Sequence, residues 1–325
     1  MNNANQQDAP GNMQQPAVLW QLPRSYLFIT VSGTVFSIIA AVYIIFNLGS
    51  RAGYVPLETQ YFYALLTVLL PSVFILFPFR RGLTARSSVP FYDLLLAIAA
   101  LGIGAYFTIN GNAIIDEGWE YAAPDIAVYL CYAYWIIVLD ALRRTGGTAV
   151  FVVAAVFSVY PVVAHLAPGF LEGPANDWSF TATYHAFGTE SIVGIPMNAF
   201  ANLVIGFLVF GVALQYTGGG AFFLNLAFAL LGRYRGGPAK VAIFGSGLMG
   251  SMSGSVITNV LTTGVMTIPA MKRVGFSPSY AAGVEACAST GGTLLPPIMG
   301  ATAFVMAVFL EVPYTEVMMA AISTS

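Results

Sequence analysis

Two short stretches toward the C-terminal end of the sequence combine hydroxyl side chains with residues that break helices. Residues 250–255 read GSMSGS, and residues 289–297 read STGGTLLPP. Glycine permits tight turns and proline removes a backbone donor, so both stretches should leave carbonyl groups without helical partners. Hydroxyl and carbonyl oxygens suit Na+ or the polar groups of an anionic substrate. The chemistry that these residues predict is the binding of an ion and a ligand.

Glu285 is the only carboxylate among residues 241–310, which contain both stretches. An ionisable side chain inside a membrane is a functional hypothesis by default. Glu285 could carry a coupling proton, balance a bound cation, or serve as a hydrogen-bonded anchor beside Ser279 or Lys272. The sequence leaves these three roles open.

Covalent chemistry finds no support in the sequence. Residues 245–250 (GSGLMG) follow an apolar run and imitate a dinucleotide-binding loop, but that motif requires an acidic residue about 20 positions later. The next acid is Glu285, which is too far away. His165 and His185 flank an acidic loop without the spacing of metal ligands. We therefore expect neither an enzyme nor a metal or organic cofactor.

The composition is that of a membrane protein. The 325 residues carry 12 Lys and Arg and 14 Asp and Glu, so only 8% are charged, against about 25% in soluble domains. Apolar residues make up 58%, and the mean hydropathy is +0.77. The net charge of -2, without a basic stripe, argues against nucleic-acid binding.

Apolar runs near the length of a membrane span recur along the chain. Residues 1–25 form a polar tail that we expect to be disordered, and a span needs about 20 apolar residues to cross the hydrocarbon core as a helix. Backbone groups in lipid must be satisfied within the segment, which favours helices. The predicted spans are 27–46, 61–79, 91–109, 126–142, 148–166 and 195–214. The shorter run 221–232 is expected to lie at the interface or to end a tilted span.

The basic residues predict an orientation for these spans. Lys and Arg cluster near residues 24, 80–86, 143–144 and 233–240, whereas 110–125 and 167–194 contain acids and no Lys or Arg. The positive-inside rule therefore places the N-terminus in the cytoplasm, with Arg51 as the one exception.

One acidic residue lies where a helix would pair it with two of these arginines. Asp140 stands three and four positions before Arg143 and Arg144, which predicts an ion pair at the interface. Asp93, at the start of the third span, is also expected near the interface.

Segment 241–271 predicts a re-entrant hairpin. It carries no charge and is bracketed by Lys240 and by Lys272 and Arg273, so it should begin and end on the same side of the membrane. Its 31 residues are too few for two complete crossings, which need about 40. Two half-crossings with their turn near 250–255 would fit, if protein or a watery cavity covers the turn.

Segment 277–311 predicts a broken helix. It is long enough to cross once, but the glycines and the proline pair in its centre weaken the helix there. Two half-helices joined by an unwound strand are a recurring design of secondary transporters. A simple proline kink is the alternative, as a small-residue packing surface is for the hairpin.

The residues of this region resemble those of a known transporter family. The resemblance is carried by 245–255, Thr263-Gly264, Ile268-Pro269, Glu285, 288–292 and 296–301. These positions are similar to the fused small-plus-large membrane subunit of tripartite ATP-independent periplasmic (TRAP) transporters, of the type that works with TAXI-class binding proteins. Residues 26–145 resemble the four-helix small subunit in topology alone. Residues 146–190 would then be a connecting helix and outer loop, and 191–325 the first half of the large-subunit transport domain.

The resemblance implies an all-α integral protein of the bacterial or archaeal cytoplasmic membrane that works as an elevator-type secondary transporter. It would import an organic acid delivered by a periplasmic TAXI-type binding protein, by symport with Na+ or, alternatively, H+. The family's large subunit has a second, inverted hairpin and broken helix, so we expect this chain to be the N-terminal part of a longer protein. A channel subunit and a membrane scaffold without transport are the alternatives. Carried over by position, the cation and substrate site comprises Ser251, Ser253, Gly254, Ser255, Asn259, Ser289, Thr290, Gly291, Gly292 and Thr293.

Overall fold

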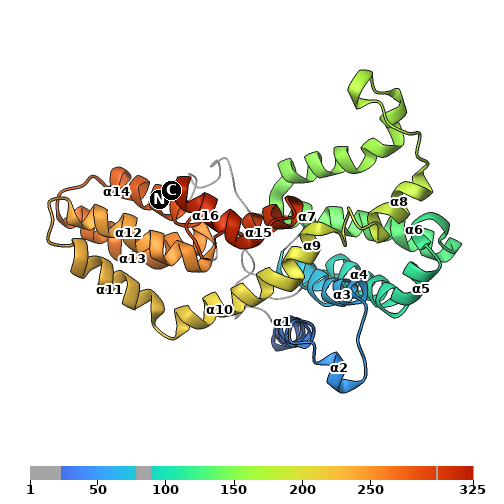
Figure 1. The fold of residues 1–325 in the computed structure, drawn as a ribbon, viewed down its shortest axis with the longest axis horizontal. Coiled ribbons are helices and arrows are strands. Elements are labelled where there is room, and N and C mark those ends of the chain that lie inside the picture. Colours follow the sequence, from blue (N-terminus) through green and yellow to red (C-terminus); the bar gives the residue numbers. More distant parts are fainter. Residues whose placement is uncertain (1–22, 78, 80–88, 298, 325) are drawn as a thin grey trace. The chain divides into compact units, whose positions relative to one another are not determined.

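The fold is all-helical. The computed structural model describes residues 23–77, 79, 89–297 and 299–324, and every regular element within those ranges is a helix (Figure 1). The all-α architecture predicted from composition is thereby confirmed. The chain divides into two compact units, the first ending at Met197 and the second beginning at Asn198.

The first unit contains five of the six hydrophobic runs that were predicted to cross a membrane, and the sixth, 195–214, lies mostly in the second unit. Its helices are α1 (Arg24–Ile45), α2 (Gly49–Ala52), α3 (Glu58–Leu76), α4 (Phe91–Ile109), α5 (Gly111–Asp116), α6 (Trp119–Ala122), α7 (Asp125–Val163) and α8 (Trp178–Phe187). Short 3-10 turns at Ala164–Leu166 and Gly169–Leu171 follow α7. In the described part of the chain, five helical segments are long and apolar enough to span a bilayer: Arg24–Ile45, Glu58–Leu76, Phe91–Ile109, Asp125–Leu166 and Ile195–Leu214.

Helix α7 joins two of the predicted spans. It runs for 39 residues, and Gly147 interrupts its helical geometry with a φ of 86°. A left-handed φ is readily adopted by glycine alone among common residues, so this position bends the helix. The kink falls between the predicted spans 126–142 and 148–166.

Glycines let the helices of the first unit approach closely. A side-chain carbon built on Gly104 of α4 would lie 2.5 Å from the hydroxyl of Thr67 in α3. One built on Gly33 of α1 would lie 2.8 Å from the side chain of Val68. Small residues at helix contacts are how membrane helices gain packing energy, because lipid tails offer no hydrophobic incentive to associate.

A buried ion pair connects α4 to α7. Asp140 contacts Arg143 at 2.6 Å and Arg144 at 2.7 Å, as the spacing predicted. Arg144 also reaches Asp93 at 2.7 Å, and the side chains of both are fully buried. Its guanidinium lies over the ring of Phe74, 4.8 Å from the ring centroid. Asp93 is therefore an internal partner of Arg144, which the sequence did not predict.

The second unit consists of helices α10 to α16, preceded by a π-helical turn at Phe200–Val204 that continues from α9 (Ile195–Ala199). Its helices are α10 (Ile205–Tyr216), α11 (Gly219–Leu231), α12 (Gly237–Ser253), α13 (Val256–Arg273), α14 (Pro278–Gly292), α15 (Ala301–Phe309) and α16 (Tyr314–Thr324). Helix α11, with 13 residues, is too short to cross upright, as expected for the run 221–232.

Helices α12 and α13 form a helical hairpin. They have 17 and 18 residues, which at about 1.5 Å per residue gives lengths near 26 and 27 Å. The hydrocarbon core of a bilayer is about 30 Å thick, so each arm falls slightly short of it. Helix α14 packs against both arms, and Figure 1 shows the three helices side by side.

The broken helix is also present. Helix α14 ends at Gly292 and α15 begins at Ala301, so the residues between them leave the helical path where the glycines and prolines predicted it. A further bend of 118° separates Thr302–Phe309 from Tyr314–Ser323. Phe304 of α15 packs with Met249 and Met252 of α12 in a buried core, which ties the second half of the broken helix to the hairpin.

Candidate functional site

The turn of the hairpin is formed by Gly254 and Ser255. Gly254 has a left-handed φ of 59°, which glycine adopts at little cost. Ser255 caps α13, because its hydroxyl accepts a hydrogen bond from the amide of Thr258 at 3.4 Å. A side-chain carbon built on Gly254 would lie 2.2 Å from the carbonyl oxygen of Met299. The tip of the hairpin therefore lies directly against the break between α14 and α15.

A cavity of about 320 Å³ lies at this tip, and we call it the tip cavity. Ser253, Ser255 and Thr258 give it a polar side. Phe207 and Phe304 give it an aromatic wall, with their ring centroids 4.9 Å apart. No charged side chain is found among the described residues that line it.

The first turns of α13 and α15 both border the tip cavity. The first amides of a helix have no helical acceptor, and the positive end of the helix dipole lies there, so anions are favoured at such positions. The tip cavity thus suits a ligand with an anionic group and an apolar part.

Asn259, one turn into α13, presents an unsatisfied acceptor. Its side chain is fully buried, and its Nδ2 donates to the carbonyl of Ser246 at 2.7 Å. Its Oδ1 has no hydrogen-bond partner among the residues that the structure describes. Buried polar atoms are almost always paired, so an orphaned oxygen points to a missing ligand such as a cation or water.

Glu285 lies at the centre of a cage of four hydroxyls. Its Oε1 accepts hydrogen bonds from Ser246 of α12 at 2.9 Å and from Ser289 of α14 at 3.1 Å. Thr263 of α13 also donates to Oε1, and Thr267 of α13 donates to Oε2. The carboxylate is fully buried, and no ion pair involves it within the described ranges. The sequence suggests Ser279 or Lys272 as a neighbour that would anchor Glu285. Its hydrogen-bond partners are instead the hydroxyls of α12, α13 and α14.

The structure divides the predicted site residues into three groups. The first, at the tip cavity, holds Ser253, Gly254 and Ser255. The second, in the buried interior between α12, α13 and α14, holds Asn259, Ser289 and Gly292.

The third group lies apart from both. Ser251 is buried and donates to the carbonyl of Leu248 in its own helix. Thr290 donates to the carbonyl of Ala286, and Thr293 to that of Thr290. Together with the exposed Gly291, these residues are absent from the described lining of the tip cavity and from the donors to Glu285.

Sequence reasoning missed Ser246, Thr263 and Thr267. The last two follow Asn259 at intervals of four, which places all three on one face of a helix. A polar stripe of this kind in an apolar segment was the available signal. The aromatic wall of Phe207 and Phe304 left no comparable signal, because aromatic residues are common throughout the sequence.

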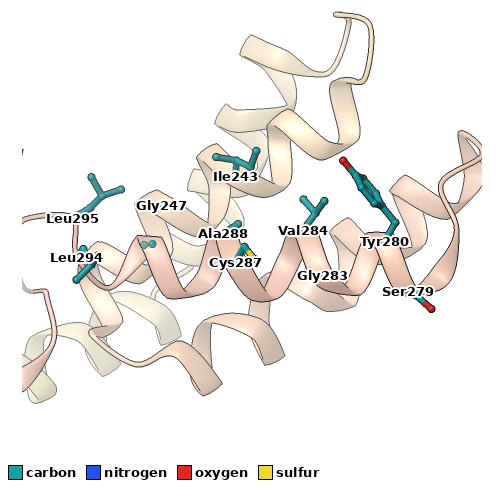
Figure 2. A pocket seen from close by; sticks show the side chains of 12 residues that line it. Ile243, Gly247, Ser279, Tyr280, Gly283, Val284, Cys287, Ala288, Leu294 and Leu295 are labelled. Carbon is teal, nitrogen blue, oxygen red and sulfur yellow. The ribbon is translucent and has the colours of Figure 1, made fainter. Parts of the chain in front are cut away.

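A larger groove of about 810 Å³ runs along α14 on another side of the second unit (Figure 2). Ile243, Val284 and Leu295 line it with small residues such as Gly283 and Gly291. The groove is apolar, and no charged residue is among the described ones that line it. Ser279 and Tyr280 supply its side-chain hydroxyls, and the rest of the lining is mostly apolar, which suits a small acid or an ion less well than the tip cavity does.

Of the two histidines that flank the acidic loop, His185 is hydrogen-bonded within the first unit and His165 is exposed. His185 contacts the carbonyl of Ser158 through Nε2 at 2.8 Å and the hydroxyl of Ser191 through Nδ1 at 2.9 Å. Its ring lies at a tilt beside Trp135, with ring centroids 4.8 Å apart, and burial lowers the pKa of His185 below its usual value. In the described part of the chain, no group of three His, Cys, Asp or Glu side chains is arranged to hold a metal ion.

Several curated proteins are similar in sequence to part of this chain. It is 32% identical over 104 residues to the uncharacterized protein YgiK of Salmonella typhimurium, covering 32% of this chain and 24% of that protein. It is 34% identical over 112 residues to the C4-dicarboxylate TRAP transporter large permease protein DctM of Vibrio cholerae, covering 33% and 25%. It is 34% identical over 110 residues to the sialic acid TRAP transporter permease protein SiaT of Haemophilus influenzae, covering 34% and 18%.

The matched segments thus span a quarter or less of the length of these three relatives. No solved structure matches the chain. The model of one protein family, the DctM component of tripartite ATP-independent periplasmic transporters, matches residues 133–324, which is more than half of the chain. The match includes the hairpin, the broken helix and the cage around Glu285. This chain belongs to the DctM family of tripartite ATP-independent periplasmic transporters.

Proposed function

We propose that the chain is part of a secondary active transporter permease that imports an organic acid across the bacterial or archaeal cytoplasmic membrane. The observation that carries this proposal is the seating of Gly254 against the carbonyl of Met299, which brings a hairpin tip and a helix break together. Irregular backbone within an apolar helical protein is stable only where it lines a cavity or is covered by protein. The tip cavity provides that setting.

An organic acid fits the chemistry of the tip cavity. The hydroxyls of Ser253, Ser255 and Thr258 and the first turns of two helices favour a carboxylate. Phe207 and Phe304 favour the carbon skeleton. The names of two relatives refer to C4-dicarboxylates and to sialic acid, both organic acids. We therefore propose an organic acid as the substrate of this chain, without naming a particular acid.

Na+ is the favoured coupling ion, with H+ as the alternative. The orphaned Oδ1 of Asn259 is a neutral oxygen that would gain a partner from a bound cation. Alkali cations prefer oxygen ligands, and unwound carbonyls and hydroxyls supply them in secondary transporters. Na+ here is a transported ion and not a resident cofactor.

The partner we propose is a periplasmic binding protein of the TAXI type. Segment 167–194 is acidic and has no Lys or Arg, so an outward location would give a basic partner a complementary surface. The N-terminus would then lie in the cytoplasm. In this arrangement residues 26–145 correspond to a fused small subunit, residues 146–190 to a connecting helix and outer loop, and residues 191–325 to the first half of a transport domain that moves as an elevator.

Reconstitution tests the proposed function. The complete permease in proteoliposomes should accumulate the acid carried by its binding protein only when that protein and an inward cation gradient are both present. Flux at channel rates without the binding protein would support a pore. Absence of any flux under both conditions would support a scaffold. Either of these results would overturn the transporter assignment.

A further inference from the structure

The carboxylate of Glu285 joins three helices of the second unit through hydrogen bonds. Its hydroxyl donors come from α12 (Ser246), from α13 (Thr263 and Thr267) and from α14 (Ser289). Ser246 also contacts Thr263 at 3.1 Å, so the hydroxyls are linked to one another. The cage therefore fixes the hairpin arms against the first half of the broken helix.

Both carboxylate oxygens are occupied by these donors. Three hydroxyls approach Oε1 and one approaches Oε2. The hydroxyls of Thr263 and Thr267 also lie within bonding distance of carbonyls in their own helix, at 2.8 and 3.0 Å. The carboxylate of Glu285 offers them a second acceptor on another helix. Its Oε1 is thus fully occupied, whereas Oε2 accepts from Thr267 alone.

The cage lies next to the proposed ion-binding group. The carbonyl of Ser246 accepts a hydrogen bond from Nδ2 of Asn259, and this bond fixes the direction in which the orphaned Oδ1 points. Gly292 lies three residues after Ser289, and a side-chain carbon built on it would be 2.3 Å from the same carbonyl. A shift of α12 against α14 would therefore move the Asn259 amide and change the start of the break.

We propose that Glu285 is a positioning residue: it holds α12, α13 and α14 in one register, so that Asn259 and the hairpin tip are set for the ion and substrate. It does not carry the coupling ion itself. This inference rests on the proposed function, since it assigns Glu285 a task within the same site. The alternative role for Glu285 is to carry a coupling proton directly, and the two roles predict different effects of substitution.

The experiment uses the complete permease with three substitutions: Glu285→Gln, Thr267→Val and, as a matched control, Thr262→Val. Thr262 is exposed on α13, and its hydroxyl donates to the carbonyl of Thr258 in its own helix. Net uptake driven by the cation gradient and exchange of labelled for unlabelled substrate are measured in the same proteoliposomes. Hydrogen exchange of the amides in 250–258 and 293–300 is measured on the purified proteins.

Positioning predicts that Glu285→Gln retains gradient-driven uptake, with the half-saturating concentration of the coupling cation raised about tenfold, as for groups that orient ion ligands. Thr267→Val should shift it in the same direction, and Thr262→Val should not. Amide exchange in both segments should be about tenfold faster in Glu285→Gln.

Loss of net uptake with exchange of substrate retained would overturn the proposal, because that pattern identifies the residue that carries the coupling proton. An unchanged half-saturating concentration with unchanged amide exchange would overturn it as well. If the unsubstituted permease transports nothing, the proposed function fails, and the amide-exchange comparison still decides whether Glu285 positions these segments.

Discussion

Replacement of Gly254 by alanine should disable the hairpin tip through two effects that can be separated. A left-handed conformation costs a residue with a side chain about 1–2 kcal/mol. The added carbon would lie 2.2 Å from the carbonyl oxygen of Met299, far inside van der Waals contact. Overpacking of this kind typically costs about 1–3 kcal/mol. The two costs sum to about 2–5 kcal/mol of stability. The overpacking cost arises where the hairpin tip contacts the break between α14 and α15.

Gly236→Ala is the matched control. Gly236 has a φ of 71°, and nothing lies within 4 Å of a carbon built on it. It should therefore lose only about 1–2 kcal/mol of stability and keep uptake. Gly254→Ala should lower the unfolding temperature of the purified protein more than Gly236→Ala does, and it should abolish uptake in proteoliposomes. Equal unfolding temperatures and equal uptake for the two variants would refute the close contact on which the site is built.

Three further predictions concern other parts of the molecule. Asn259→Leu should raise the half-saturating concentration of the coupling cation about tenfold, measured as uptake against Na+ concentration; an unchanged value would remove Asn259 from the ion site. Arg144→Met should lower the free energy of unfolding by about 3–5 kcal/mol, because Asp93 is left buried without its cation. Arg143→Met should cost about 1 kcal/mol or less, because its pair with Asp140 is partly exposed; thermal unfolding that ranks the two variants equally would contradict the buried pair. Because burial depresses the pKa of His185 below the unfolded value of 6.5, the folded state binds its proton less readily, so stability should fall as pH drops below 6.5 toward the lowered pKa. His185→Gln should flatten that slope in melting curves recorded from pH 7.5 to 5, and an identical slope would refute the assignment.

The sequence was sufficient for the features that depend on local composition. Long apolar runs gave the spans, because a helix must satisfy its own backbone in lipid. The break between α14 and α15 was predictable because Gly291, Gly292 and the following proline pair all weaken a helix. The hairpin turn at Gly254 and Ser255 was predictable for similar reasons, although α12 continues as a helix through most of 250–255.

Contacts between distant residues could not be predicted in this way. Glu285 accepts from Ser246, 39 positions earlier, and Arg144 pairs with Asp93, 51 positions earlier. Both depend on which faces of two helices meet, and that is decided by packing across the whole unit. The role imagined for Glu285 near Lys272 failed because the helix turns the carboxylate toward α12 and α13. The prediction that Asp140 pairs with Arg144 was confirmed because both residues lie on one helix, four positions apart.

The central claim is that the tip cavity receives the transported acid. The most direct test replaces Ser255 with cysteine in a Cys287→Ala background, because Cys287 is exposed and Cys131 is buried. The rate of modification by a small thiol reagent is measured in the complete permease, with and without the coupling cation and the acid that its binding protein carries. Cation and acid together should slow modification of Ser255→Cys and leave modification of Thr262→Cys unchanged. A rate at Ser255→Cys that does not respond to cation and acid would contradict it.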